Sequence, residues 1–326
     1  MVRQLGFVLV VLSTCVVPVV GQEETTILSM ELGSELMLRI KPCEPVSVLL
    51  TVFVSPTETT ETIERIPREL ARRVVIDGRA YARVGRGANE AAWFWLGNSS
   101  LAPVDSDKNG VEVGCLLYWN AADDDCLFRT PGEHRVEFQG DAVLNIVVEP
   151  PTAEEAKILE ALWGNGAESG MFILTSDDRR SEALIPVVEQ LLEQYPDTVY
   201  TPYLTIAVGM YKLTRERPEA GPDRVAWLTE RRKVKKYFEP YVQDEISSIF
   251  ELKATYGLAT IAYEEVILAS EGESEDLDAR RRYTVALFEK IKASPYAADY
   301  HSTVASRLRS LRRMEETRTG DGSDRP

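Results

Sequence analysis

The stretch that decides the fold is Glu149-Pro150-Pro151-Thr152-Ala153-Glu154-Glu155, where the hydrophobic pattern changes its period. Two consecutive prolines lack the amide hydrogens that a sheet or a helix interior needs, so they form a short, stiff connection. Thr152 and Glu155 then have the spacing of a capping box, in which each side chain satisfies a backbone amide at a helix start. The stretch therefore predicts the end of one domain and the beginning of a helical one.

Residues 22–149, before this boundary, have the pattern of a β domain. Residues 46–54 are rich in β-branched side chains, and Asp77-Gly78 separates two short apolar runs as a hairpin turn does. Residues 134–148 predict a second hairpin. Many short strands without a long helical stretch are typical of an antiparallel β-sandwich. Residues 128–148 also resemble the closing strands of immunoglobulin-like bacterial domains, in which a Pro-Gly turn precedes the last two strands.

Residues 150–314, after the boundary, have apolar side chains at steps of three and four, which predicts helices that bury one face. Thr201-Pro202 is a typical helix start. The run 195–200, Tyr-Pro-Asp-Thr-Val-Tyr, resembles the junction between tetratricopeptide repeats of bacterial envelope proteins. That resemblance implies an α-helical repeat-like (TPR-like) domain with one or two degenerate repeats. Residues 315–326 contain no apolar side chain and are predicted to form a disordered tail.

Residues 1–21 have the three parts of a signal peptide. Arg3 supplies the positive charge, residues 5–20 are mostly apolar, and small residues at 19–21 suit a signal peptidase. A retained membrane anchor is the alternative, although this apolar run is short for a bilayer and contains Pro18. Lipidation is a third possibility, because residues 12–15 resemble a lipoprotein box ending in Cys15, with a departure at Thr14. We expect a secreted or periplasmic protein without a later transmembrane segment.

The charge balance narrows the choice of partners. The chain carries a formal net charge of −15 at neutral pH. Such a surface repels phosphate backbones and anionic lipid headgroups, which argues against nucleic acid and membrane surfaces as partners.

Three cysteines follow the predicted signal peptide, and an exported protein can oxidise them. Cys115 and Cys126 flank the turn-like run 120–123, so a disulfide between them across a hairpin is one possibility, with Cys43 left free. Buried thiols are an equal alternative, because pairing does not follow from spacing alone.

The sharpest local motif is Asp105-Ser106-Asp107-Lys108-Asn109-Gly110, which fits the first half of a calcium loop. Asp105, Asp107 and Asn109 would supply the oxygen ligands that Ca²⁺ prefers. The twelfth position, however, is Leu116, where such a loop has a bidentate Glu. An Asn-Gly hairpin turn is the competing interpretation.

No catalytic motif stands out, and a non-enzymatic role in protein–protein interaction or scaffolding in the cell envelope is the first expectation. The runner-up is a carbohydrate- or peptide-binding module that uses Trp93 and Trp95, which share a strand face, although aromatic side chains more often fill cores. A hydrolase with dispersed carboxylates is the third. His134 and His301 have no paired metal spacing, and the basic run 231–236 is expected to be a solvated helix face.

Overall fold

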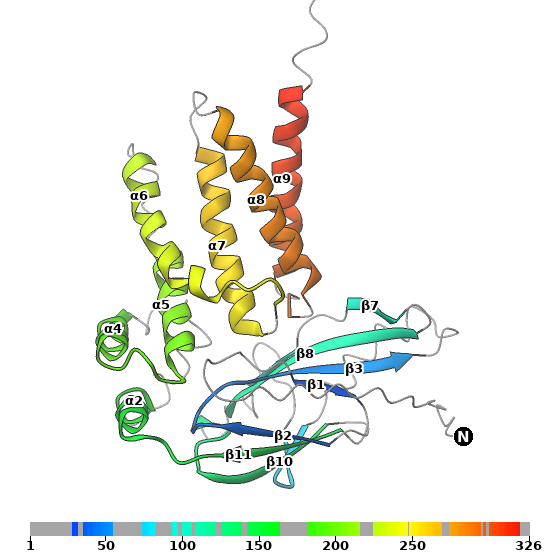
Figure 1. Cartoon of the computed structure of the whole chain (residues 1–326), viewed down its shortest axis with the longest axis vertical. Coiled ribbons are helices and arrows are strands. Elements are labelled where there is room, and N and C mark those ends of the chain that lie inside the picture. Colours follow the sequence, from blue (N-terminus) through cyan, green and yellow to red (C-terminus); the bar gives the residue numbers. More distant parts are fainter. Residues whose placement is uncertain are drawn as a thin grey trace, which may run out of the picture.

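The computed structural model describes residues 28–31, 35–54, 74–81, 93–96, 100–105, 108–120, 125–138, 142–163, 182–215, 224–246, 248–268, 274–294, 296–297 and 300–319. Within this part, strands come first in the sequence and helices follow from residue 153 onward (Figure 1). The predicted signal peptide, with Arg3 and Cys15, lies outside the described residues.

The strands form two sheets. The larger one has the order β1 (Leu28–Glu31), β3 (Val46–Val54), β8 (Lys108–Asn120) and β6 (Trp93–Leu96), and β8 also pairs with β7 (Ser100–Asp105) and β9 (Asp125–Cys126). The smaller one has the order β2 (Glu35–Ile40), β11 (Val143–Val148), β10 (Gly132–Phe138), β4 (Val74–Ile76) and β5 (Arg79–Tyr81). The pairs β1–β3 and β2–β11 are parallel, whereas the other pairs are antiparallel, so both sheets are mixed.

Both hairpins expected from the sequence are present. Asp77 and Gly78 turn the chain between β4 and β5 with φ angles of 51° and 78°, the left-handed values that a tight two-residue turn requires. β10 and β11 pair in antiparallel register from Gly132↔Val148 to Glu137↔Val143. Their inward side chains, with those of the larger sheet, bury a core that includes Val48, Leu117, Val136 and Leu144.

Seven α-helices lie in the described part: α2 (Ala153–Trp163), α4 (Ile185–Gln194), α5 (Thr201–Arg215), α6 (Arg224–Val234), α7 (Ile249–Leu268), α8 (Ser274–Ala293) and α9 (His301–Thr319). The capping box at α2 is confirmed. The Glu155 amide donates to Thr152 Oγ1 at 3.2 Å, and the Thr152 amide donates to Glu155 Oε2 at 2.7 Å. Helix α9 continues through residues 315–319, so the predicted tail boundary is too early.

Helix α7 is the centre of the helical part, with α5, α6 and α8 packed against it (Figure 1). Its buried residues lie on nearly all sides of the helix, among them Leu252, Ala254, Leu258 and Ile261. Two short 3₁₀ helices, η3 (Lys235–Tyr237) and η4 (Glu239–Tyr241), bring Phe238 into this core, where its ring is fully buried. The ring packs against the backbone at Gly209 of α5 and Gly257 of α7.

The predicted fold class, an antiparallel β-sandwich followed by a TPR-like repeat domain, is wrong. The sheets are mixed because β1 and β2 join them in parallel, and helical residues outnumber strand residues in the described part. The helices differ in length, and α5, α6 and α8 pack against one helix, α7, that is buried on nearly all sides, whereas an array of repeats needs similar amphipathic pairs. The three- and four-residue periodicity predicted the helices but not how they pack.

The predicted domain boundary at residue 150 is bridged by a continuous core. Leu116, Tyr118 and Cys126 of the larger sheet, with Cys43 of the loop between β2 and β3, belong to the same buried cluster as side chains from all seven helices. The chain therefore passes from strands to helices at Glu149-Pro150-Pro151, but the two parts share one hydrophobic core. None of the helices that the structure describes is long and apolar enough to cross a membrane.

Candidate binding cleft between the sheets and the helices

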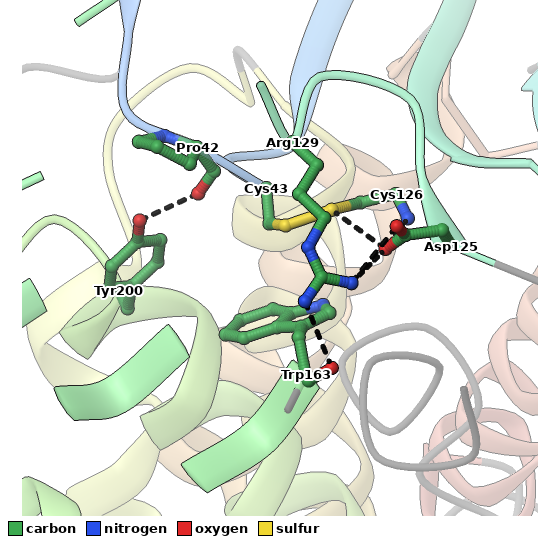
Figure 2. The surroundings of a disulfide bond; sticks show 7 residues. All are labelled: Pro42, Cys43, Asp125, Cys126, Arg129, Trp163 and Tyr200. Atoms are coloured by element: carbon green, nitrogen blue, oxygen red, sulfur yellow. Dashed lines mark hydrogen bonds and ion pairs between the residues drawn. A yellow bond between two sulfur atoms is a disulfide. The ribbon is translucent and has the colours of Figure 1, made fainter. Parts of the chain in front are cut away.

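A disulfide anchors the loop that leads from β2 to β3. Cys43 of this loop is bonded to Cys126 of β9, with a Cα–Cα distance of 5.4 Å (Figure 2). Cys43 has a left-handed φ of 58°, and its amide donates to the Phe128 carbonyl at 2.8 Å. The loop is therefore fixed covalently and through its backbone to the segment that follows β9.

Two tyrosines of α5 and the turn before it hold the other side of the same loop. Tyr200 donates its hydroxyl proton to the Pro42 carbonyl at 2.6 Å (Figure 2), and Tyr203 donates to Glu44 Oε1 at 3.3 Å. Burial raises the pKa of Tyr200 strongly, and the nearby carboxylates of Glu155 and Glu44 raise it further. Tyr200 therefore stays protonated as a hydrogen-bond donor at every physiological pH.

Arg129 connects the disulfide region to the end of α2. Its Nη1 lies 2.9 Å from both carboxylate oxygens of Asp125, and its Nη2 donates to the Trp163 carbonyl at 3.3 Å (Figure 2). The Trp163 ring in turn lies 5.7 Å from the Tyr200 ring, centroid to centroid. The disulfide, α2 and α5 thus form one fixed support behind the loop.

A cleft of about 350 Å³ opens in front of this support, between the sheets and the helices. Its lining comprises residues 38–41 of β2 and the loop, residues 44–47 leading into β3, Glu149, Val199, Pro202, Tyr203 and Ile206 around the start of α5, and Tyr241, Ser248, Phe250 and Glu251 near the start of α7. The rings of Tyr203 and Phe250 meet edge to face at 4.6 Å. The lining of the cleft thus combines apolar and aromatic side chains with a few polar and charged ones, as binding sites for small ligands and side chains commonly do.

The charged groups on the strand side of the cleft are engaged with one another or with the helix starts. Arg39 Nη1 lies 3.2 Å from Glu149 Oε1, and Lys41 Nζ lies 3.5 Å from Glu149 Oε2 and 3.8 Å from Glu155 Oε2. Glu44 accepts hydrogen bonds at both oxygens, from Tyr203 and from the Lys41 amide. These carboxylates hold the loop and the helix starts together.

The disulfide differs from the pairing of Cys115 with Cys126 that the sequence suggested. The hairpin between β8 and β9 does form, but its register sets Cys126 opposite Trp119, four positions beyond Cys115. Four residues of strand span about 13 Å, which is too far for a disulfide. Cys43, expected to be free, is the actual partner because the β2–β3 loop passes over β9.

Four other residues singled out in the sequence, Trp93, Trp95, Asp105 and Asn109, lie in strands of the larger sheet. Asp105 and Asn109 belong to β7 and β8, which form a hairpin with Asp105 opposite Lys108, whereas Asp107 lies outside the described residues. Asn109 and Gly110 pair with Pro103 and Ala102 within the ladder, so the competing interpretation, an Asn-Gly turn, is wrong. Ca²⁺ binding stays a prediction. The ladder between β6 and β8 shifts register opposite Trp93 and Phe94, where the extra residue belongs to β8, and a ligand platform of Trp93 and Trp95 stays a prediction.

Groups that could bind a metal are few in the described residues. The one cluster of His, Cys and acidic side chains there is Cys43, Asp125 and Cys126, and both of its sulfurs belong to the disulfide. His134 lies elsewhere, with Nδ1 2.7 Å from Asp77 Oδ2 and Nε2 3.0 Å from the Thr130 carbonyl. His301 begins α9, far along the chain from both.

The basic run 231–236 is a solvated face only in part. Arg231, at 2% exposure, is buried, and its Nη1 donates to the carbonyls of Lys212 and Leu213 at the end of α5. Arg232 and Lys235 instead bind the same carboxylate, that of Glu265 in α7, at 2.8 and 2.9 Å. The cluster fastens α6 and η3 to α5 and α7, and the sequence pattern did not reveal the buried arginine.

Glu265 makes this ion-pair group sensitive to acid. Burial raises the pKa of Glu265, but the hydrogen bonds and charges of Lys235 and Arg232 outweigh burial, so the pKa is below its ordinary value. A carboxyl group with a lowered folded-state pKa contributes stability that is present above its unfolded pKa and is lost as the pH falls towards the folded value.

We therefore expect Glu265→Gln to reduce the free energy of unfolding by about 2 kcal/mol at neutral pH, because two charge-assisted hydrogen bonds are lost. The difference from the unmodified chain should shrink as the pH falls below the unfolded-state pKa of a glutamate, about 4.3, and towards the lowered pKa of the folded state. Urea unfolding across this pH range measures it. Glu230→Gln, which removes an exposed pair with Lys233, is the matched control and should cost less than about 0.5 kcal/mol. An equal loss in acid would contradict the assignment.

Comparisons of the chain with models of protein families, with curated proteins and with solved structures gave no match. The functional argument therefore depends on the cleft and its surroundings.

Proposed function

We propose that the chain is an exported, non-enzymatic protein that binds a protein partner. The cleft between the sheets and the helices would bind apolar side chains of that partner. The observation that carries the proposal is the cleft itself, about 350 Å³ between Val199, Ile206 and Phe250 on the helical side and the β2–β3 loop on the other. Its support is held by a disulfide and by two tyrosine hydrogen bonds, so binding requires little ordering of the site.

Binding accounts for the cleft better than hydrolysis does. A hydrolase needs a carboxylate or another group that is available to a substrate or a water molecule. Glu44 accepts hydrogen bonds at both of its oxygens, and Glu149 pairs with Arg39 and Lys41. These two carboxylates beside the cleft are therefore used for structure.

A random dodecapeptide library displayed on phage tests the proposal with the chain from Gln22 onward as bait. We expect enriched peptides with apolar side chains, and we expect Val199→Arg and Ser47→Arg, on opposite walls, to weaken their binding at least about tenfold because each fills the cleft with a charge. Val187→Arg, at an exposed position of α4 that does not line the cleft, is the control and should bind normally. Selected peptides that bind all three variants equally would refute the cleft as the site.

A further inference from the structure

The helical wall of the cleft carries a group of rings. Tyr203 of α5, Tyr241 of η4 and Phe250 of α7 all line it, together with Pro202 at the start of α5. The rings of Tyr203 and Phe250 meet at 4.6 Å, and Tyr203 and Tyr241 keep part of their surface exposed. Flat apolar rings that are partly open to solvent can receive the rings or aliphatic side chains of a partner.

The carboxylates around the cleft are already engaged. Glu44 accepts hydrogen bonds at both of its oxygens, and Glu149 is held by two cations. Glu251, near the start of α7, is 7% exposed and is not free either. In the backbone of the strand wall, the Ile40 carbonyl accepts from the Glu149 amide at 2.8 Å. A peptide in the cleft would therefore lose water from its amide hydrogens without gaining an acceptor for each, which weakens binding.

Two hydroxyl groups in the lining are available. Tyr241, on the helical wall, and Ser47, on the strand wall, have no side-chain partner among the residues that the structure describes. Each hydroxyl can donate to a carbonyl oxygen of a bound peptide. The cleft is therefore better suited to the carbonyl groups of a peptide than to its amide hydrogens.

Proline meets both conditions, because it has a carbonyl group, no amide hydrogen and an apolar ring. Building on the binding function proposed above, we propose that the partner enters this cleft with a proline-rich segment in the polyproline II conformation. That conformation has no internal hydrogen bonds, and its three residues per turn place every third ring on one face. Such a segment is partly ordered before it binds, so less entropy is lost in the cleft.

Two matched peptide libraries test the preference. Both consist of dodecapeptides displayed on phage, and the fixed positions, every third residue, are proline in one library and alanine in the other. With the chain from Gln22 onward as bait, the proline library should yield at least about ten times more binders, because even one unpaired buried amide weakens binding about tenfold. Equal yields from the two libraries would overturn the inference.

Chemical substitution in the selected peptides separates the missing hydrogen from the ring. Alanine in place of the prolines restores the amide hydrogens and should weaken binding at least about tenfold. N-methylalanine has no amide hydrogen, so it should bind within about threefold of the proline peptide. Isothermal titration calorimetry compares the three versions of each peptide. If N-methylalanine binds no better than alanine, amide desolvation does not decide the preference and the inference fails.

Tyr241→Phe removes only the hydroxyl and keeps the ring in the wall. The proline-rich peptides should bind this variant about fivefold more weakly, because one hydrogen bond to a prolyl carbonyl is lost. Tyr283→Phe is the matched control, since Tyr283 is 50% exposed on α8 and does not line the cleft, and it should bind normally. Identical binding by both variants and the unmodified chain would overturn the assigned donor.

The proline preference and the cleft can fail separately. Peptides that lose binding in Val199→Arg but contain no excess of proline would support the cleft and overturn the proline preference. Proline-rich peptides that bind Val199→Arg as tightly as the unmodified chain would instead overturn the cleft as their site.

Discussion

Alanine in place of Gly257 is expected to lower the free energy of unfolding by about 3 kcal/mol, although alanine is the better helix former. A Cβ atom at this position would lie 2.5 Å from two ring atoms of Phe238, and that ring is fully buried. The ring has little room to move, because it is fully buried and a Cβ at Gly209 of α5 would also lie 2.8 Å from it. Without this contact, the same substitution in a helix would stabilise the chain by about 0.5–1 kcal/mol.

A double-mutant cycle with Phe238→Leu separates the steric effect from helix propensity. The smaller side chain creates a cavity and is itself destabilising. In the Phe238→Leu background, however, Gly257→Ala should cost much less, because the added methyl group can occupy part of that space. Urea unfolding followed by circular dichroism measures all four variants. A Gly257→Ala variant that is more stable than the unmodified chain would show that Phe238 does not fill this slot.

What the sequence predicted correctly is local. The Asp77-Gly78 turn depends on two residues that tolerate positive φ, and the capping box of Thr152 and Glu155 depends on a spacing of three. Both are decided within a few residues, so the pattern was sufficient. Two pairings, β1–β3 and β2–β11, are parallel. The hydrophobic pattern of these strands would be the same in an antiparallel sheet, so the sequence wrongly indicated a purely antiparallel sandwich.

The cleft could not be predicted for a related reason. Leu38, Val199 and Phe250 line it together, although they come from a strand, a turn and a helix far apart in the sequence. No spacing connects them. Arg231 was misjudged because periodicity alone does not reveal the carbonyls of Lys212 and Leu213, at the end of another helix, that its guanidinium binds.

Loss of the disulfide between Cys43 and Cys126 is expected to have the largest effect on stability. The bond closes a loop between residues 83 positions apart, and in the chain-entropy account its removal costs about 4.5 kcal/mol through greater freedom of the unfolded chain. It also frees the β2–β3 loop, which forms one wall of the cleft. We therefore expect Cys43→Ala, or a reducing agent, to lower the unfolding midpoint and to weaken binding of the selected peptides together.

The three cysteines provide their own control. Cys115 takes no part in the bond, so the Cys115→Ala variant should lose as much stability on reduction as the unmodified chain does. The stability of Cys43→Ala and of Cys126→Ala should not change when the reductant is added. Mass spectrometry of the unreduced, digested chain should find the peptide containing Cys43 joined to the one containing Cys126. Stability and peptide affinity should be measured separately, because Tyr200 and Tyr203 also hold the loop that the disulfide fastens. If the loop keeps its place through those two hydrogen bonds after reduction, stability falls while peptide affinity is unchanged. A joint loss of both would show that the covalent bond, and not the tyrosines, fixes the wall of the cleft.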